Sequence, residues 1–422
     1  MRPLLLAALL VSGIGVPAAA DAGAEEVEEV EEVDEVAPAK VRRFKWMILP
    51  NVGFDTDDGL GFGARAELQR VDADIDPYRW GLVLQGFVTL RGYHHHRFHV
   101  DVPGLGRNGR IRLTLRFAYR QWLNDGYWGI GNGTFREREF VGSFDKGDPA
   151  RKRYRYWLIQ PFAHIAVRWD LGDSPFALFG NLKVQWTKVD TYPGSRLESE
   201  RPVGMDGGLT TQLGVGFLLD TRYPEIAPER GVLAEVSARF APAFPGSAGA
   251  YAGPFVSLRV YGGLVPGRLV LAGRVMAEWL VGDVPFFEMV RWGGSVPILG
   301  FGGFETVRGA SFGRWRAPGR AVGNLELRID VIKHNLFKQP MRWQLVPFAD
   351  VGAVWGAGAN ATASPPDFPL HPTVGLGIHV IWAEAFVGRV DFGVGPDPIA
   401  EEDGSLTQAV GWGIYLMFDQ TF

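Results

Sequence analysis

Hydrophobic and polar residues alternate one by one through most of the chain from Phe44 to Phe422. In LTLRFAY, residues 113–119, the leucines and aromatic residues fall on odd positions, and the same period recurs in LKVQWT at 182–187. A period of two predicts β-strands with one apolar face. The pattern predicts sixteen strands, at 44–53, 60–71, 79–91, 95–102, 110–121, 154–170, 176–190, 208–220, 230–241, 251–263, 267–281, 321–332, 341–355, 372–382, 385–395 and 408–422.

The connections between these predicted strands alternate in length. Long ones, at 122–153, 191–207, 282–320 and 356–371, are separated by short ones such as 103–109, 171–175, 264–266 and 383–384. An even number of strands with short turns at one end and long loops at the other is typical of a bacterial outer-membrane barrel. A soluble sandwich would also alternate, but its apolar faces would form a core. We therefore predict an all-β fold, a sixteen-stranded antiparallel transmembrane β-barrel.

The composition also favours a membrane barrel over a helical membrane protein. Glycine occurs 56 times, aromatic residues make up 13% of the chain, and the mean hydropathy is zero. Many tryptophans fall near predicted strand ends, where barrels carry aromatic girdles, although a carbohydrate-binding surface would use the same residue types. Since cysteine is absent, the chain has neither a disulfide nor a thiolate metal site.

The first 43 residues lack the strand pattern. Residues 1–20 are typical of a secretory signal peptide, with Arg2, an apolar core and a small-residue cleavage site, and an uncleaved anchor is the alternative. Residues 21–43 contain the acidic run EEVEEVEEVDEV, which we interpret as a disordered periplasmic leader or as a docking tail for a basic partner. This leader is too short for a folded domain, so the outer-membrane barrel is predicted to occupy 44–422.

The charge distribution gives no support for nucleic-acid binding. The net charge is −4, but nine of the 47 acidic residues lie within 1–36, and the rest of the chain holds 38 acidic and 42 basic residues. The barrel region is therefore slightly basic, and it contains no basic block.

The stretches LDTRYPEIAPERG, GGFETVRG, GNLELR and VPFADVGAVW resemble parts of the BamA/TamA surface-antigen superfamily of outer-membrane barrels. GGFETVRG, residues 302–309, looks like the signature external loop of that family, and GNLELR and VPFADVGAVW resemble the two strands that follow it. LDTRYPEIAPERG, residues 219–231, looks like the family's periplasmic turn, through Asp220, Thr221, Arg222, Pro228 and Gly231. The resemblance covers the barrel and indicates a member that lacks the periplasmic POTRA domains.

The resemblance implies that the signature loop folds into the barrel lumen and that its arginine, Arg308, contacts acidic side chains of the wall. The other signature positions are Gly302, Gly303, Val307 and Gly309. Glycines there would permit the tight backbone that this path needs.

Alternation along the next two strands supplies partners for this arginine, because it turns Glu326 and Asp350 toward the lumen. A guanidinium group suits bidentate contact with carboxylates. A solvated loop arginine with no fixed partner is the alternative, and Ala310 stands where the family usually has an aromatic residue. Pro347 lacks an amide donor within its predicted strand and is expected to mark a bulge or bend.

The first and last strands are expected to pair and close the barrel. Pro50 removes a hydrogen-bond donor from the first, and Gly411 and Gly413 weaken the last, so this seam could open sideways. In relatives that insert outer-membrane proteins, such opening is thought to matter. The last strand carries Phe418 and Phe422 on its apolar face, which resembles the C-terminal signal that barrel-assembly machinery recognises.

Other motifs do not complete a site. YHHHRFH, residues 93–99, contains four histidines, but alternation puts only His94 and His96 on one side, so we expect solvated loop histidines rather than a metal site. YWGIGN, residues 127–132, precedes no helix, as a dinucleotide motif would, and no serine lies in a nucleophile elbow. We predict no catalytic residue, no enzyme activity, no cofactor and no metal.

The family resemblance implies a protein that assists insertion or translocation of polypeptide, or of lipid, at the bacterial outer membrane. A passive pore or barrel anchor without client-handling activity is the alternative, and a surface-adhesion protein acting through its external loops is a third hypothesis. The expected partners are outer-membrane lipids, the barrel-assembly machinery during biogenesis and a candidate periplasmic partner protein. Nucleic acid is not expected.

Overall fold

The computed structural model describes most of the chain after the predicted leader. The described residues are 44–72, 75–106, 108–140, 152–336, 339–356, 370–382, 386–418 and 421–422. The predicted signal peptide, 1–20, and acidic leader, 21–43, lie outside them. Within the described ranges, no helix is both long enough and apolar enough to cross a lipid bilayer.

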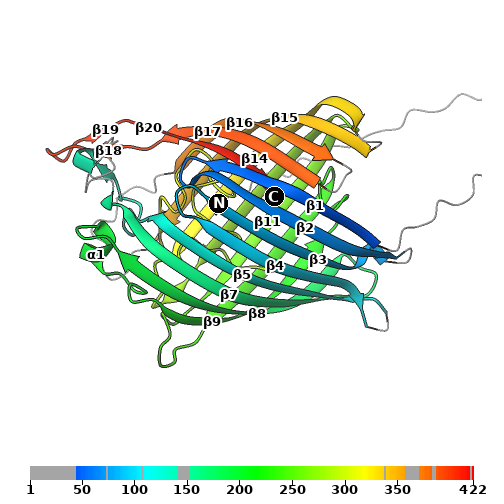
Figure 1. Ribbon diagram of the computed structural model, residues 1–422, viewed down its shortest axis with the longest axis horizontal. Coiled ribbons are helices and arrows are strands. Elements are labelled where there is room, and N and C mark those ends of the chain that lie inside the picture. The colour runs from blue at the N-terminus through cyan, green and yellow to red at the C-terminus, as the bar shows by residue number, and fades with distance from the viewer. Residues whose placement is uncertain are drawn as a thin grey trace, which may run out of the picture. The chain divides into compact units, whose positions relative to one another are not determined.

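Sixteen long strands of the described chain form one closed antiparallel sheet (Figure 1). In chain order they are β1 (Phe44–Asp55), β2 (Gly59–Asp72), β3 (Ile75–Thr89), β4 (His94–Leu105), β5 (Ile111–Gly126), β7 (Arg155–Asp170), β8 (Phe176–Thr191), β9 (Gly208–Asp220), β10 (Gly231–Ala241), β11 (Tyr251–Val265), β12 (Leu269–Trp279), β14 (Gly319–Leu336), β15 (Gln339–Trp355), β16 (His371–Trp382), β17 (Phe386–Pro396) and β20 (Val410–Phe418). The connections hold short elements: β6 (Arg136–Glu137), η1 (Arg138–Phe140), α1 (Arg196–Glu200), β13 (Val281–Gly282), β18 (Ile399–Ala400) and β19 (Leu406–Thr407).

The order of the strands confirms the predicted barrel. Each long strand pairs with the next one along the chain, and β20 pairs with β1, which closes the sheet. Each of the sixteen predicted segments corresponds to one of these strands. The short elements α1, β18 and β19 lie together at the left end of the barrel in Figure 1, where long connections leave the strands.

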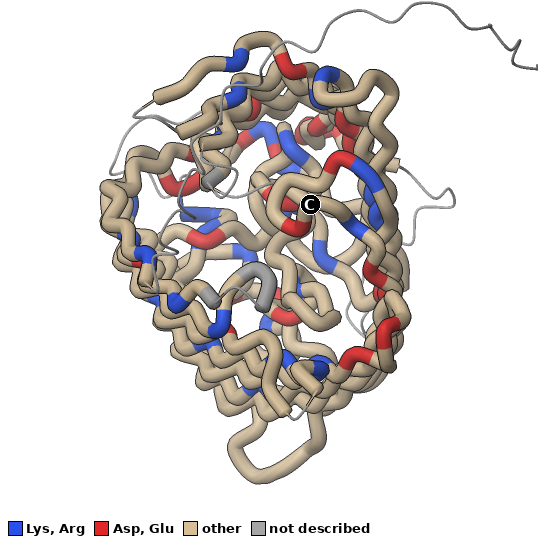
Figure 2. Tube along the Cα trace, turned by 90° about the vertical axis from the view of Figure 1, so that its right-hand side faces the viewer, with Lys and Arg blue, Asp and Glu red and all other residues tan. Residues whose placement is uncertain are grey.

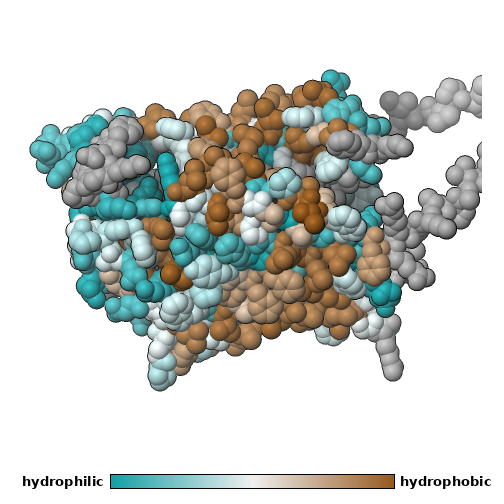
Figure 3. All heavy atoms as spheres, viewed as in Figure 1, coloured by the Kyte–Doolittle hydropathy of each residue, from teal (hydrophilic) through white to brown (hydrophobic). Residues whose placement is uncertain are grey.

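The two faces of the sheet differ as a membrane barrel requires. On β14, Leu325 and Val331 are 50% and 55% exposed, whereas Glu326 and Arg328 between them are buried. Brown hydrophobic residues cover much of the strand surface in Figure 3, and teal residues gather at the left end. Apolar side chains therefore face outward and polar side chains face inward, the reverse of a soluble sandwich.

The connection between β12 and β14 packs inside the barrel rather than beyond its end. Its residues Trp292, Phe301, Val307 and Trp315 form a buried cluster with inward-facing side chains of the strands, among them Met276. Figure 2, which looks into the ring of strands, shows chain segments inside it. This segment, residues 283–318, is called the inner loop below.

Pro347 does not mark the bulge expected from the sequence. Pairing of β14 with β15 is absent opposite Pro347, but it resumes at Ile329 and Leu345 in the same register as Glu326 and Phe348. The shift of register in this pair lies between Asp330 and Ile332. Proline removes one ladder hydrogen bond, but no residue is inserted, so the register is kept.

Candidate functional site

The guanidinium of Arg308 is fully buried and binds carboxylates of two neighbouring strands. Its Nε and Nη2 donate to the two oxygens of Asp350, at 2.9 and 3.0 Å, and its Nη1 donates to Oε1 of Glu326 at 2.8 Å. The main-chain N–H of Arg308 also donates to Asp350, at 3.0 Å. These are the two carboxylates that alternation pointed inward, and the bidentate contact is one that lysine cannot make.

A third carboxylate, which the sequence analysis missed, completes this set of contacts. Asp391 on β17 lies 3.4 Å from Nη1 of Arg308, and it also binds Arg389 and, at 2.9 Å, Nε2 of His379. The guanidinium carbon of Arg308 lies 3.5 Å from the ring centre of Phe348. Alternation in FVGRVDFGV already turns Asp391 inward, so the signal was present in the sequence.

The glycines of the signature loop have the backbone conformation that the sequence led us to expect. Gly302, Gly303 and Gly309 have φ values of 92°, 83° and 104°. A Cβ on Gly302 would come within 2.1 Å of a main-chain oxygen, and one on Gly309 within 2.7 Å of the Val394 nitrogen. The chain can therefore reach β17 only with glycine at these positions. Val307 between them is fully buried.

The tip of the inner loop docks through its backbone, although Ala310 replaces the family's usual aromatic residue. The carbonyl of Ala310 accepts from Gly303 N at 2.8 Å and from the Tyr415 hydroxyl at 3.2 Å. Gly309 N donates to the same hydroxyl at 3.1 Å. Tyr415 belongs to β20, so the loop tip is attached to the last strand.

A second set of ion pairs holds the beginning of the inner loop. Glu288 is bonded by Arg239 at 3.2 Å and by Lys183 at 3.3 Å. Burial acts to raise the pKa of Glu288, but Lys183, Arg291 and Arg239 outweigh it and hold this pKa at about 2. Farther along, Arg314 donates to Asp397 at 3.0 Å. The inner loop is thus fastened by charge along its length.

The seam between the first and last strands is short. β1 and β20 pair only at Phe54 with Leu416 and at Asp55 with Tyr415, whereas β1 pairs with β2 at all twelve of its residues. Pro50 lies in the unpaired part of β1. Within the described chain, residues 44–53 therefore have no partner on the β20 side.

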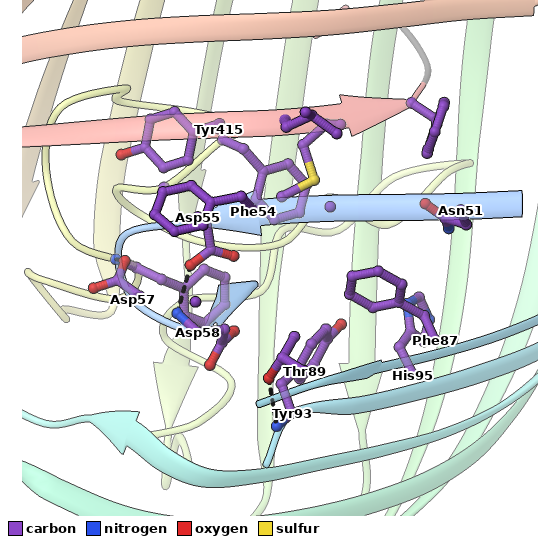
Figure 4. Close-up of a pocket in the computed structure, with 18 of the residues that line it drawn as sticks. Asn51, Phe54, Asp55, Asp57, Asp58, Phe87, Thr89, Tyr93, His95 and Tyr415 are labelled. Atoms are coloured by element: carbon purple, nitrogen blue, oxygen red, sulfur yellow. Dashed lines mark hydrogen bonds between the residues drawn. The ribbon is translucent and has the colours of Figure 1, made fainter. Parts of the chain in front are cut away.

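A cavity of about 160 Å³ lies beside the paired end of the seam (Figure 4). Three carboxylates from the β1–β2 turn line it, and Asp58 N donates to Asp55 at 2.5 Å. Asp57 accepts from Phe312 N of the inner loop at 2.8 Å. Burial raises the pKa of Asp57 and, together with the neighbouring carboxylates Asp55 and Asp57, raises that of Asp58 well above its usual range.

Phe422 does not continue the outward face of the last strand, contrary to the sequence prediction. β20 ends at Phe418, and Phe422 is 6% exposed. Its ring lies 6.4 Å from that of Tyr261 and 4.9 Å from the guanidinium of Arg274, and its main-chain oxygen accepts from Arg328 at 3.1 Å. Cation–π and aromatic contacts inside the barrel replace contact with lipid.

The predicted periplasmic turn lies between β9 and β10 and is held by hydrogen bonds of its own. Arg222 binds both carboxylate oxygens of Asp220, each at 3.0 Å. Val232 N donates to the Thr221 hydroxyl at 2.9 Å, and Gly231 has a φ of 101°. Pro228, also in this turn, is buried. None of these residues contacts Arg308, so the turn and the arginine site are independent.

The histidines of YHHHRFH divide between the two faces of β4. His94 and His96 lie side by side, with ring centres 5.9 Å apart, and His96 stacks on Tyr119. His95 and His99 line cavities inside the barrel. Among the described residues, no group of three or more potential ligands could hold a metal ion.

Taken with its apolar exterior, the closed sheet defines an outer-membrane β-barrel. Residues 176–418 match the model of the Omp85 superfamily domain. Because this match covers more than half of the sequence, the chain belongs to the Omp85 superfamily, which confirms the family recognised from the sequence motifs, and it resides in the bacterial outer membrane.

Solved structures share this fold at low sequence identity. BamA from Haemophilus ducreyi lacking POTRA domains 1-3 is similar with a TM-score of 0.53 and 15% identity, over 89% of this chain and 70% of that one. CdiB from Escherichia coli is similar with a TM-score of 0.55 and 12% identity, over 88% of this chain and 63% of that one. The chain thus spans about two thirds of each of these structures. No curated protein matches its sequence.

Proposed function

We propose that this barrel assists the insertion or translocation of polypeptide at the outer membrane, and that the seam is where it acts. The observation that supports this role is the edge of β1. Of its twelve residues, two pair with β20, and the other ten have no partner on that side within the described chain. An unpaired edge can accept another strand, and about 9–11 residues are what a transmembrane strand needs.

The inner loop has a supporting role in this proposal. Arg308 ties the loop to β14, β15 and β17, and the contacts of Gly309 and Ala310 with Tyr415 tie it to β20. Phe312 ties it to the β1–β2 turn. A loop attached to both sides of the seam would hold the seam closed until the loop moves. This role requires no covalent step, so we propose that the protein is not an enzyme.

A cross-linking experiment tests the proposal. The chain has no cysteine, so Phe54→Cys with Leu416→Cys adds a single thiol pair across the seam. Vesicles containing the barrel are mixed with a denatured eight-stranded outer-membrane protein, and its folding into the lipid is followed by gel mobility. We expect faster folding than in protein-free vesicles, loss of this gain when the disulfide forms, and recovery after reduction.

A matched pair of cysteines controls for the cross-link itself. Leu325→Cys with Ala349→Cys joins β14 to β15 within the unbroken pairing that runs from Gly319 with Trp355 to Glu326 with Phe348. This disulfide should leave the folding rate unchanged. If the wild-type barrel gives no acceleration, or if the two disulfides have the same effect, the proposal is wrong.

A passive pore or barrel anchor is the second candidate, and the cavities left beside the inner loop favour it. Two of them, of about 390 and 330 Å³, are lined by inward-facing side chains of the strands. A steady open conductance in planar bilayers would support this candidate. Affinity capture from native outer membranes, yielding a periplasmic partner protein, would instead support the polypeptide-handling role.

A further inference from the structure

Four basic or imidazole side chains form a row across the inner wall of the barrel. His99 on β4 is directly opposite Arg116 on β5, Arg116 is opposite His164 on β7, and His164 is opposite Lys183 on β8. Directly opposed side chains on neighbouring strands lie about 4.5–5.5 Å apart at their Cβ atoms, so the four groups form one continuous row. This row, His99, Arg116, His164 and Lys183, is called the basic ladder.

Compensation within the chain reaches only one end of the basic ladder. Lys183 lies 3.3 Å from Glu288. Among the described residues, no carboxylate forms an ion pair with Arg116, and Asp101, whose charge acts on it, is already bonded by Arg112. Arg120, two pleat repeats farther along β5, also forms no ion pair with a described carboxylate and rests on the ring of Phe162, 4.7 Å away. The wall thus keeps positive charge that the protein itself does not neutralise.

The side chain of His164 gives independent evidence that this wall binds a hydrogen-bonding ligand. The residue is 1% exposed, and neither of its ring nitrogens has a hydrogen-bond partner within the described chain. Buried polar groups are almost always paired, because an unpaired one costs about 1–3 kcal/mol. His164 lines the same cavity as Arg116, Arg120 and Lys183.

The cavity in front of the basic ladder has the size of a small-molecule site. Its volume is about 390 Å³, within the usual range of about 300–1,000 Å³. Glu305 of the inner loop is the one carboxylate among its described lining residues, against six arginine and lysine side chains. Figure 2 shows Lys and Arg positions recurring around the ring of strands.

We propose that the basic ladder binds an anion bearing a phosphate or sulfate group inside the barrel. Arginine forks match the oxygens of such groups, lysine adds a point charge, and an imidazole N–H can donate to a remaining oxygen. The anion would neutralise Arg116 and give His164 its missing hydrogen-bond partner. Its binding does not depend on polypeptide insertion at the seam.

The test uses the purified full chain in neutral detergent, with inorganic phosphate as the probe. Phosphate replaces chloride at constant ionic strength, and binding is followed by phosphorus NMR line broadening and by the thermal unfolding midpoint. We expect saturable broadening and a higher midpoint in phosphate. Arg116→Gln should weaken binding roughly tenfold, the loss expected for one charge-assisted contact. In phosphate-free buffer the same variant should unfold at a higher temperature, because an unpaired cation is removed.

Arg110→Gln is the matched control, since Arg110 is an exposed arginine beside the start of β5 and pairs with Asp173 at 3.2 Å. It should leave phosphate binding unchanged. The proposal is overturned if the wild-type chain shows no saturable phosphate binding, a result that does not depend on the folding of any variant. It is also overturned if both variants weaken phosphate binding equally. If phosphatidylglycerol micelles compete with phosphate, the natural ligand is a lipid headgroup. If they do not compete, the ligand is a soluble anion, and either result supports the site.

Discussion

Two walls of the barrel carry inward-facing charge, and they differ in where the opposite charge comes from. One wall, the acidic wall, consists of Glu326, Asp350 and Asp391 on β14, β15 and β17, and the inner loop brings Arg308 to it. The other wall holds the basic ladder, for which the chain provides Glu288 at one end only. Each carboxylate of the acidic wall has a cation within ion-pair distance, whereas Arg116 of the basic ladder forms no ion pair with a described carboxylate.

This difference suggests two roles for charge inside one barrel. On the acidic wall, the ion pairs fix the path of the inner loop, because removing Arg308 would leave Asp350 buried without a cation. On the basic wall, the missing counter-charge leaves an affinity for an external anion. The predictions below test this contrast, beginning with the largest effect.

Arg308→Ala should be the most damaging substitution. It leaves the carboxylates of the acidic wall without their shared cation, and breaking a buried pair costs about 3–5 kcal/mol of unfolding free energy. The inner loop should become sensitive to protease, and conductance in planar bilayers should rise. Unchanged conductance together with unchanged protease sensitivity would show that Arg308 does not hold the loop.

Arg308→Lys should have an intermediate effect. It keeps the positive charge but loses the bidentate contact with Asp350, so we expect a loss of about 1.5–3 kcal/mol, the range for hydrogen bonds to charged groups. Urea unfolding in detergent measures it. If the lysine variant is as unstable as Arg308→Ala, the geometry of the fork matters more than its charge.

Arg116→Glu should give the basic wall a carboxylate from within the chain, so that its charge is compensated as it is on the acidic wall. The substitution removes the cation and places an acid where the charges of Arg97 and Arg112 act, and pairs of opposite charge contribute about 0.2–1 kcal/mol. The variant should therefore be slightly more stable than wild type and should not bind phosphate. A less stable variant would mean that Arg116 is already compensated.

A pH-dependent effect is expected at the β1–β2 turn, where the excess charge is negative. Because burial raises the pKa of Asp58 when the chain is folded, the folded state binds its proton more tightly than the unfolded state does. Stability should then fall as pH rises above the unfolded value of about 3.9 toward the raised folded value. The groups that set this pKa include Asp55, Asp57, Asp125 and Arg155.

Asp58→Asn removes the titrating group and should lose this part of the pH dependence. Urea unfolding at pH 4 and pH 8 compares the two proteins, and the variant should be the more stable one at pH 8. If the unfolding free energy changes equally with pH in the variant and in wild type, the pH dependence does not come from Asp58. Asp173→Asn, an exposed carboxylate at the opposite end of the barrel, serves as the control.

Much of the barrel could be predicted because the relevant signal is local. Alternation within a strand decides which side chains face inward, so Glu326 and Asp350 could be named as candidate partners of Arg308 before their distances were known. Asp391 was within reach of the same reasoning. Phe422 was not, since the period of two holds only while the strand continues, and β20 ends at Phe418.

By itself, the sequence determined the number of strands, their inward and outward faces, and the family of the barrel. The tertiary structure decided which residues meet: the two-residue seam, the place of Phe422 beside Arg274, and the alignment of His99, Arg116 and His164 across three strands. The physical reason is register. A shift of one residue in the pairing of two neighbouring strands changes which side chains are opposite each other on each face of the sheet. Nothing within a single strand specifies that shift.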